Sequence, residues 1–87
     1  SRYKIGYVRY DYLKENNLSV SIAIKEKYER KGFGKIMLTK SLKKRNIKKF
    51  NIFAFIKNDN LSSKKFFLSF GFIKFKKNVY MKKASKR

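Results

Sequence analysis

The chain has 87 residues, of which 43% are hydrophobic and 17% aromatic, and its formal net charge at pH 7 is +20. This length limits it to one small domain, and the apolar content suffices for a packed core and excludes a wholly disordered chain. Cysteine and histidine are absent, which excludes disulfides and thiolate metal sites and removes the usual base and metal ligand. We therefore expect no metal.

The positive charge has two interpretations. The 25 Lys and Arg residues outnumber 5 Asp and Glu residues, as in proteins that bind nucleic acid, membrane surfaces or phosphorylated substrates. The other interpretation is codon bias, because Lys, Asn, Ile, Phe and Tyr have AT-rich codons, and the even spread of the lysines favours it. No apolar run approaches the roughly 20 residues that span a bilayer, and no signal peptide is visible. The expected location is the cytoplasm, with no membrane partner.

The first third of the chain predicts an antiparallel hairpin. Ile5–Tyr12 alternates bulky and smaller residues and is typical of a strand. Lys14–Asn17 is a polar turn. Leu18–Ile24 alternates strictly, with apolar side chains such as Val20 and Ile22 on one face and small residues on the other.

A Gly-rich turn, Gly32-Phe33-Gly34, joins this strand to a helix predicted over Gly34–Arg45. Two glycines permit positive φ and close approach of a ligand to the main chain. The free N–H groups of the first helical turn and the positive end of the helix dipole favour an anion. Arg30, Lys31 and Lys35 add positive charge. The turn is suited to phosphate, although helices also begin after glycine for structural reasons alone.

The predicted helix carries apolar residues at helical spacing, and Asn46 is expected to end it as its C′ residue. Phe50–Ile56 is apolar on both faces, which is typical of a central strand covered on both sides. Strand, helix and strand at this spacing predict a right-handed βαβ crossover with parallel strands.

The last third of the chain predicts a second helix and a closing hairpin. Asn58-Asp59-Asn60 is a turn with an N-cap, and a helix is expected over Leu61–Phe70. Gly71 is expected to stop this helix and Phe72 to fold back onto it.

The closing strands are expected over Phe72–Lys76 and Val79–Met81, followed by a basic tail, Lys82–Arg87, expected to be frayed. We see no internal repeat, linker or second domain. The expected fold class is α/β (α+β), in one domain over residues 1–87.

Two separated motifs resemble the GNAT acetyltransferase superfamily. Tyr28-Glu29-Arg30-Lys31-Gly32-Phe33-Gly34-Lys35 is similar to the family's [Arg/Gln]-x-x-Gly-x-[Gly/Ala] loop for the acetyl-CoA pyrophosphate. The stretch from Asn60 to Phe72 is similar to Asn-x-x-[Ala/Ser]-x-x-x-Tyr-x-x-x-Gly-Phe. The resemblance extends from Ile5 to about Met81. It implies a partial GNAT fold that lacks the usual N-terminal strand and two helices, which wall the acceptor site.

The resemblance implies an N-acetyltransferase that uses acetyl-CoA and a primary amine. Backbone N–H groups of residues 31–35 would hold the pyrophosphate. Residues 22–24 would pair with the pantetheine arm, where their strand diverges from Phe53-Ala54-Phe55, and an N–H near Ile24 would stabilise the oxyanion. Asn60 would hydrogen-bond the pantetheine. The implied cofactor-binding residues are Ile22, Ala23, Ile24, Arg30, Lys31, Gly32, Phe33, Gly34, Lys35, Asn60, Ser63 and Phe67.

Three departures from the family pattern concern charge and proton transfer. Glu29 occupies the usual Arg/Gln position, with Arg30 one residue late. Phe67 occupies the position of the tyrosine that protonates the departing thiolate, and phenylalanine has no proton to give. Asp11 is the only acid on a predicted strand, and a solvated aspartate at a strand end explains it more simply than a catalytic base. The general acid and base are thus unassigned.

Several functions remain open. The run Ile5–Asp11 followed by Ser19–Ile22 resembles GNAT modules linked to nucleotide-amino-sugar synthesis, which implies a sugar amine as acceptor; protein N-termini and antibiotics are alternatives. A second copy or a preceding domain would then complete the acceptor site. Two alternatives to an active enzyme are a basic nucleic-acid-binding module and a GNAT relic that binds coenzyme A without catalysis. Clustered tyrosines would favour nucleic acid, but alternate aromatics more simply pack under the sheet; the tyrosines concerned are Tyr3, Tyr7, Tyr10 and Tyr12.

Overall fold

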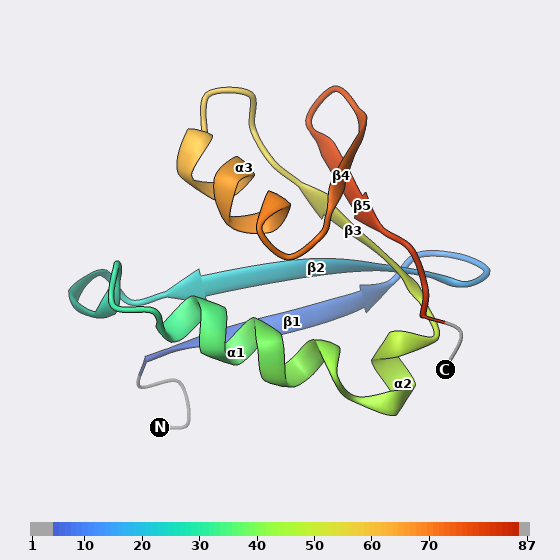
Figure 1. Cartoon of the computed structure of the whole chain (residues 1–87), viewed down its shortest axis with the longest axis horizontal. Coiled ribbons are helices and arrows are strands. Elements are labelled where there is room, and N and C mark those ends of the chain that lie inside the picture. Colours follow the sequence, from blue (N-terminus) through green and yellow to red (C-terminus); the bar gives the residue numbers. More distant parts are fainter. Residues whose placement is uncertain (1–4, 86–87) are drawn as a thin grey trace.

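A computed structural model describes residues 5–85 of the chain. It contains a mixed five-stranded sheet in the order β1-β2-β3-β5-β4, with helices packed against it (Figure 1). The strands are β1 (Gly6–Tyr12), β2 (Asn17–Ile24), β3 (Asn51–Phe55), β4 (Ile73–Lys76) and β5 (Val79–Lys82). The helices are η1 (Glu26–Tyr28, a 3-10 turn), α1 (Phe33–Leu42), α2 (Arg45–Lys48) and α3 (Leu61–Leu68). The predicted α/β (α+β) class, with its mixed sheet, hairpin, second helix and closing strand, is confirmed.

Strand pairing confirms the predicted hairpin and crossover. β1 and β2 are antiparallel from Gly6↔Ile24 to Tyr12↔Leu18. β2 continues through η1 and α1 to β3, which pairs with it in parallel. The parallel register ends at Ser19↔Phe53, although β2 continues to Ile24. The two strands therefore part along the second half of β2, and Figure 1 shows β3 crossing β2 at a steep angle.

One face of the sheet carries the hydrophobic core. Leu38 of α1 is fully buried, and it packs with inward residues of β2 and β3 and with α3. The Tyr10 hydroxyl and the Ser41 Oγ are 2.7 Å apart, which fixes α1 against β1. Burial raises the pKa of Tyr10, and its hydrogen bond to Ser41 opposes that shift. The core residues are Leu18, Val20, Leu38, Ile52, Ala54, Ile56, Phe67, Phe72 and Tyr80.

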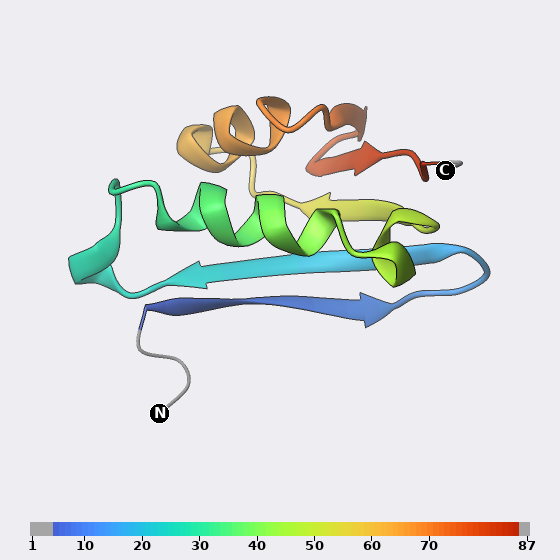
Figure 2. The ribbon, with the colours of Figure 1, turned by 60° about the horizontal axis from the view of Figure 1, so that its bottom comes forward.

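The prediction that β3 is covered on both sides was wrong. Ile52 and Ala54 are buried, but Phe55, which lies on the other face, is exposed. The reason is that α1 and α3 both pack into the core cluster on the inner face. Figure 2 shows α1 and α3 on the same side of β2.

The prediction of one helix from Gly34 to Arg45 was also wrong at its end. α1 stops at Leu42, and a separate turn, α2, begins at Arg45. Asn46 therefore lies inside α2 and is not a C′ residue. The chain breaks at Lys44, whose backbone is extended, and this break lets Ile47 and Phe50 pack against the core on the way to β3.

The C-terminal elements agree with the sequence except at the tail. Asn60 caps α3, Gly71 has a φ of +90°, and Phe72 is buried with its ring 5.1 Å from that of Phe67. The expected fraying is contradicted for residues 82–85. Lys82 ends β5, and the N–H of Ala84 donates to Asn51 Oδ1 at 2.9 Å. Tyr3 and the last two residues of the expected tail lie outside the described residues.

Asn51 joins three segments at the closed end of the β2–β3 pair. Its N–H donates to the Asn16 carbonyl at 2.8 Å, and its Nδ2 donates to Asn17 Oδ1 at 3.1 Å. Its Oδ1 accepts the N–H of Ala84. The β1–β2 turn, β3 and the tail are thus fixed at the end of the sheet opposite to the point where β2 and β3 part.

Candidate functional site

A cleft of about 540 Å³ lies beside the second half of β2, beyond the last residue of β2 that pairs with β3. Its walls come from the second half of β2, the loop before α1, the first turn of α1 and the first turns of α3. The lining residues are Ile22, Ile24, Tyr28, Glu29, Arg30, Gly32, Phe33, Gly34, Lys35, Asn60, Ser62, Ser63 and Phe66. The structure thus brings together the two motifs that the sequence singled out.

The Gly-rich turn forms one end of this cleft. Gly32 is the N-cap of α1 with a φ of +84°, and a Cβ there would meet no atom within 4 Å. Backbone conformation, and not crowding, is therefore what favours glycine. The helical hydrogen bonds of α1 begin at Ile36, whose N–H donates to the carbonyl oxygen of Gly32 at 3.1 Å. The N–H groups that precede it lie at the positive end of the helix dipole, which favours an anion.

The charges around this turn are mainly positive. Arg30, which also has a positive φ of 63°, and Lys35 line the cleft, and the first turn of α1 contains no acidic residue. Glu29 lines the cleft as well, so a carboxylate does stand beside the predicted phosphate position. Lys31 is exposed and does not line the cleft.

The tyrosine that precedes the Gly-rich turn stabilises its shape. The rings of Tyr28 and Phe33 meet edge to face with their centroids 5.6 Å apart, and Lys27 Nζ lies 5.5 Å from the centroid of the Tyr28 ring. The loop before α1 is therefore closed by an aromatic contact across the glycine. Tyr28 was not among the predicted site residues, and its place at the start of the first motif was the available signal.

The opposite end of the cleft is formed by the start of α3. Asn60 Oδ1 accepts the N–H of Ser63 at 3.1 Å and the Ser62 hydroxyl at 3.3 Å. Helical spacing then carries Ser63 and Phe66 along the same side of α3. A Cβ at Gly34 would be 3.6 Å from the Phe66 ring, so α3 and the first turn of α1 pack closely where both line the cleft.

Besides Lys31, two further predicted cofactor residues do not line the cleft. The Phe67 side chain is buried in the core and does not line the cleft; its neighbour Phe66 does. Sequence reasoning missed Phe66 because adjacent helix positions point about 100° apart, and the spacing of three from Ser63 was the signal that could have found it. Ala23 lines a separate hollow of about 210 Å³ with Gly6 and Tyr7. The role predicted for Ala23 is backbone pairing with the pantetheine arm, and the Ala23 backbone lies in β2, whose second half lines the cleft.

Asp11 lies outside the cleft. It is on β1, exposed, and its Oδ2 accepts a hydrogen bond from Arg9 Nε at 3.1 Å. This position is that of a solvated, paired aspartate. In residues 5–85 no group of three or more His, Cys, Asp or Glu side chains is arranged to hold a metal ion, and no helix in this range is long and apolar enough to cross a membrane.

Comparison with known proteins gives the family. Residues 3–72 match the acetyltransferase (GNAT) family. The fold is similar to the crystal structure of Ard1 from Thermoplasma volcanium, with a TM-score of 0.71 and 17% sequence identity. That match covers 88% of this chain and 60% of Ard1, so the chain spans less than two thirds of this relative. No protein of curated function matches the sequence. Because the family match extends over most of the chain and includes both cleft motifs, the chain belongs to the GNAT family of acetyltransferases.

Proposed function

We propose that this chain binds acetyl-CoA in the cleft between β2, α1 and α3 and takes part in acetyl transfer to a primary amine. The observation that carries the proposal is the position of both GNAT motifs on one cleft beside the second half of β2, beyond its pairing with β3. GNAT acetyltransferases generally use acetyl-CoA as the donor, and the residues present suit its parts.

The phosphates fit the end of the cleft at the Gly-rich turn. The N–H groups of residues 31–35 precede or open α1, and two cations, Arg30 and Lys35, line the same wall. Lys31 does not line the cleft, and its proposed part is its backbone N–H. Glu29 works against a phosphate by like-charge repulsion. The proposed anion site therefore combines a helix N-terminus with two cations and one opposing carboxylate.

The pantetheine arm fits along the freed edge of β2. Beyond Ser19, β2 is no longer paired with β3, so its backbone groups there are available as a strand edge. Ile22 and Ile24 provide apolar contact, and the Asn60 amide, whose Oδ1 is used by the α3 cap, retains an Nδ2 donor for an amide carbonyl. An extended arm pairing with β2 would place its end near the backbone N–H of Ile24.

The chemistry proposed for this arrangement is mainly positioning. An activated thioester held beside an amine needs little more than alignment and an N–H for the developing oxyanion. Phe67 offers no proton and is buried, and a thiol with a pKa of about 8.5 leaves tolerably without an acid. Asp11 lies away from the cleft, so we propose that the acceptor amine loses its proton to water or to a group outside this chain.

We propose that the acceptor is the amine of a nucleotide-linked amino sugar. Support comes from the resemblance of Ile5–Asp11 and Ser19–Ile22 to GNAT modules of that pathway, and from the net charge of +20, which favours phosphorylated substrates. A second copy or a preceding domain would complete the acceptor side. The cytoplasm, where acetyl-CoA is made and used, is the proposed location.

Calorimetric titration of the 87-residue chain with acetyl-CoA tests the proposal. We expect saturable binding that coenzyme A displaces and that adenosine, which has no phosphate, does not. Absence of heat together with absence of a thermal shift would reject the cofactor site. Binding without turnover on a panel of amines would identify a non-catalytic relic, and turnover of simple amines but not of nucleotide-linked sugars would reject the acceptor class.

The nucleic-acid alternative is less well supported. Tyr10, one of the tyrosines expected to cluster, packs inward and bonds Ser41, so the aromatics of β1 do not form one exposed set. Filter binding of single-stranded RNA over a salt series separates the two functions, because tight binding with a steep salt slope would favour RNA.

A further inference from the structure

The outer face of the C-terminal half of the sheet carries a row of apolar side chains. In the antiparallel register, Phe53 of β3 is opposite Met81 of β5, which is opposite Ile73 of β4. Residues directly opposite in antiparallel strands project on the same face, and this face is the reverse of the one on which Ile52 and Ala54 join the core. The row therefore crosses three strands on the face away from α1 and α3.

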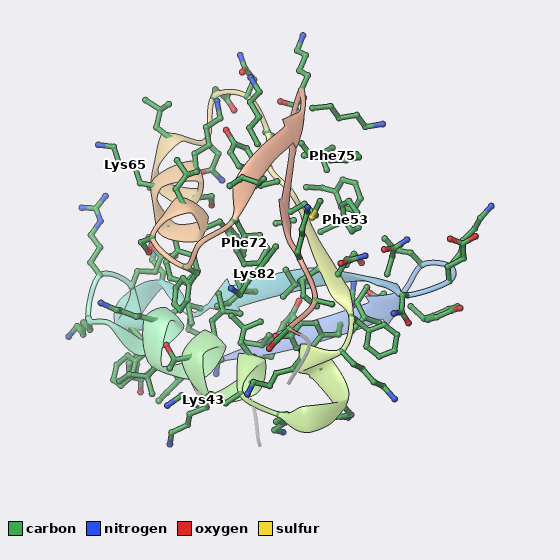
Figure 3. The ribbon with its side chains drawn as sticks, turned by 45° about the vertical axis from the view of Figure 1, so that its right-hand side comes forward. Lys43, Phe53, Lys65, Phe72, Phe75 and Lys82 are labelled. Carbon is green, nitrogen blue, oxygen red and sulfur yellow. The ribbon has the colours of Figure 1, made fainter. Side chains whose placement is uncertain are left out.

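Two phenylalanines extend this row into a patch. Phe75 meets Phe53 edge to face, with ring centroids 5.5 Å apart, and Phe55 is two residues further along β3. Figure 3 shows Phe53 and Phe75 together on the side of the sheet opposite to Phe72. We call this set the outer patch; its members are Phe53, Phe55, Ile73, Phe75 and Met81.

Three of the five side chains of the outer patch are largely exposed, and Phe53 and Met81 are half-buried. Phe55 is 62% exposed, Ile73 is 56% exposed and Phe75 is 54% exposed. Single exposed apolar residues are ordinary, but a contiguous apolar patch usually marks an interaction surface. In residues 5–85, α1 and α3 pack against the inner face of the sheet, and the usual cover for an apolar sheet face is a helix or a second sheet.

The charges around the outer patch are of one sign. Asp59 is the last acidic residue of the sequence, and β3 contains none. The salt bridge found in residues 5–85 lies on β1, between Arg9 and Asp11. Lysines also stand at the ends of all three strands of the patch: Lys57, two residues after β3, Lys76 and Lys77 at the β4–β5 turn, and Lys83 directly after β5. Lys74 and Lys82 are opposite the core residues Tyr80 and Ile52 and lie on the inner face.

We propose that the outer patch docks an amphipathic helix of a partner protein, with an apolar stripe against the patch and Asp or Glu residues along both edges of the stripe. The apolar stripe covers the exposed phenylalanines, and the acidic edges meet the lysines without carboxylate competition from this chain. Complementary charge also raises the rate of encounter with a chain of net charge +20.

The composition of the patch favours a helix over the other occupants. Bases stack on exposed ring faces, whereas the Phe53 and Phe75 rings are at 84° to each other, and aliphatic Ile73 and Met81 lie in the row. A second copy would bring its own lysines against these lysines, which like-charge repulsion opposes. This inference concerns the outer face and is independent of the proposed acetyl-CoA cleft.

Fluorescence anisotropy of a labelled designed peptide tests the inference. The peptide is an amphipathic helix of Leu, Ala and Glu with leucines at helical spacing, and the comparison peptide replaces every Glu by Lys. The 87-residue chain should bind the acidic peptide and not the basic one. Phe55→Asp and Ile73→Asp should each weaken binding by about tenfold or more, as a charge does at an interface centre. Leu68→Asp, at a 49% exposed position on α3, should leave binding unchanged.

Folding controls keep this test decisive. Thermal unfolding of each variant, followed by circular dichroism, should show native-like transitions, and acetyl-CoA titration reports the cleft separately. The inference is overturned if the acidic peptide does not bind, or if it binds equally well to the patch variants. It is also overturned if poly(U) RNA is the ligand that the patch variants lose, or if sedimentation shows a dimer that Phe55→Asp dissociates.

Discussion

The Asn60 side chain accepts the N–H of Ser63 at 3.1 Å, and this hydrogen bond opens α3 at the edge of the cleft. One amide therefore has two tasks in the proposed site. Its Oδ1 caps the helix, and its Nδ2 is proposed to donate a hydrogen bond to the ligand. Because the two tasks use different atoms, substitutions can separate them.

Asn60→Asp should separate the cap from ligand binding. Aspartate retains the capping oxygen, so thermal stability should stay close to that of the parent, but it loses the Nδ2 donor and adds a negative charge, so acetyl-CoA should bind several-fold more weakly. Asn60→Ala should lose about 1 kcal/mol of stability through the cap. Chemical denaturation and calorimetric titration of both variants check this. Equal affinity of Asn60→Asp and the parent for acetyl-CoA would remove Asn60 from the site.

Gly32→Ala should harm both the fold and the binding of acetyl-CoA. At a φ of +84°, an alanine costs roughly 1 kcal/mol relative to glycine, and relaxation of the turn would redirect the N–H groups at the start of α1. Gly34→Ala is the matched control for stability, because its Cβ would make ordinary contacts at 3.6 Å with Phe66. Thermal unfolding should separate the two variants, with Gly32→Ala the less stable. Unchanged acetyl-CoA affinity in Gly32→Ala would contradict the phosphate role of the turn.

Glu29→Gln should strengthen acetyl-CoA binding. The carboxylate lines the cleft beside Arg30, and its removal takes away like-charge repulsion worth about 0.5 to 1 kcal/mol at a solvated position, or roughly a two- to fivefold gain in affinity. The gain should shrink as salt is raised, because exposed charges are screened. Titrations at low and high salt check this, and Glu26→Gln on the preceding turn is the control. A loss of affinity in Glu29→Gln would contradict this, because it would mean that the carboxylate contacts acetyl-CoA favourably and does not repel its phosphates.

Tyr10→Phe should destabilise the chain by about 1 kcal/mol near neutral pH, through loss of its hydrogen bond with Ser41. Burial raises the Tyr10 pKa above its ordinary value of 10.0, and the hydrogen bond to Ser41 lowers the pKa by a smaller amount. A raised folded-state pKa gives stability that is fully present below pH 10 and is lost as the pH rises through the folded pKa. Urea unfolding from pH 7 upward should show this alkaline loss in the parent and a smaller one in Tyr10→Phe. Parallel pH curves for the two proteins would contradict it.

Local patterns predicted the elements that local interactions form. Strict alternation over residues 18–24 predicted β2 and its inward face, and the turn before it predicted the hairpin. The cap at Asn60 and the stop at Gly71 bounded α3, which ends at Leu68. Both motifs of the cleft were visible in the sequence because each lies within one turn and one helix start.

The errors concern contacts between distant segments. An apolar run such as Phe53-Ala54-Phe55 does not say whether one or two faces are covered, since that depends on where the helices pack. Fraying of the tail could not be judged from its lysines, because Ala84 is held by Asn51. Phe66 replaced Phe67 in the cleft because one helix position decides which side chain faces inward.

Asn51 also bears on how the cleft could change its width. It ties the Asn16–Asn17 turn and Ala84 at one end of the β2–β3 pair, and the parallel pairing ends soon after, at Ser19 and Phe53. The two strands are thus held together near Asn51, and they separate toward Ile24 at the end of β2. Because the parallel pairing is limited to this end of the two strands, we expect substitutions of Asn51 to alter the width of the cleft, although Asn51 lies at the opposite end of the sheet.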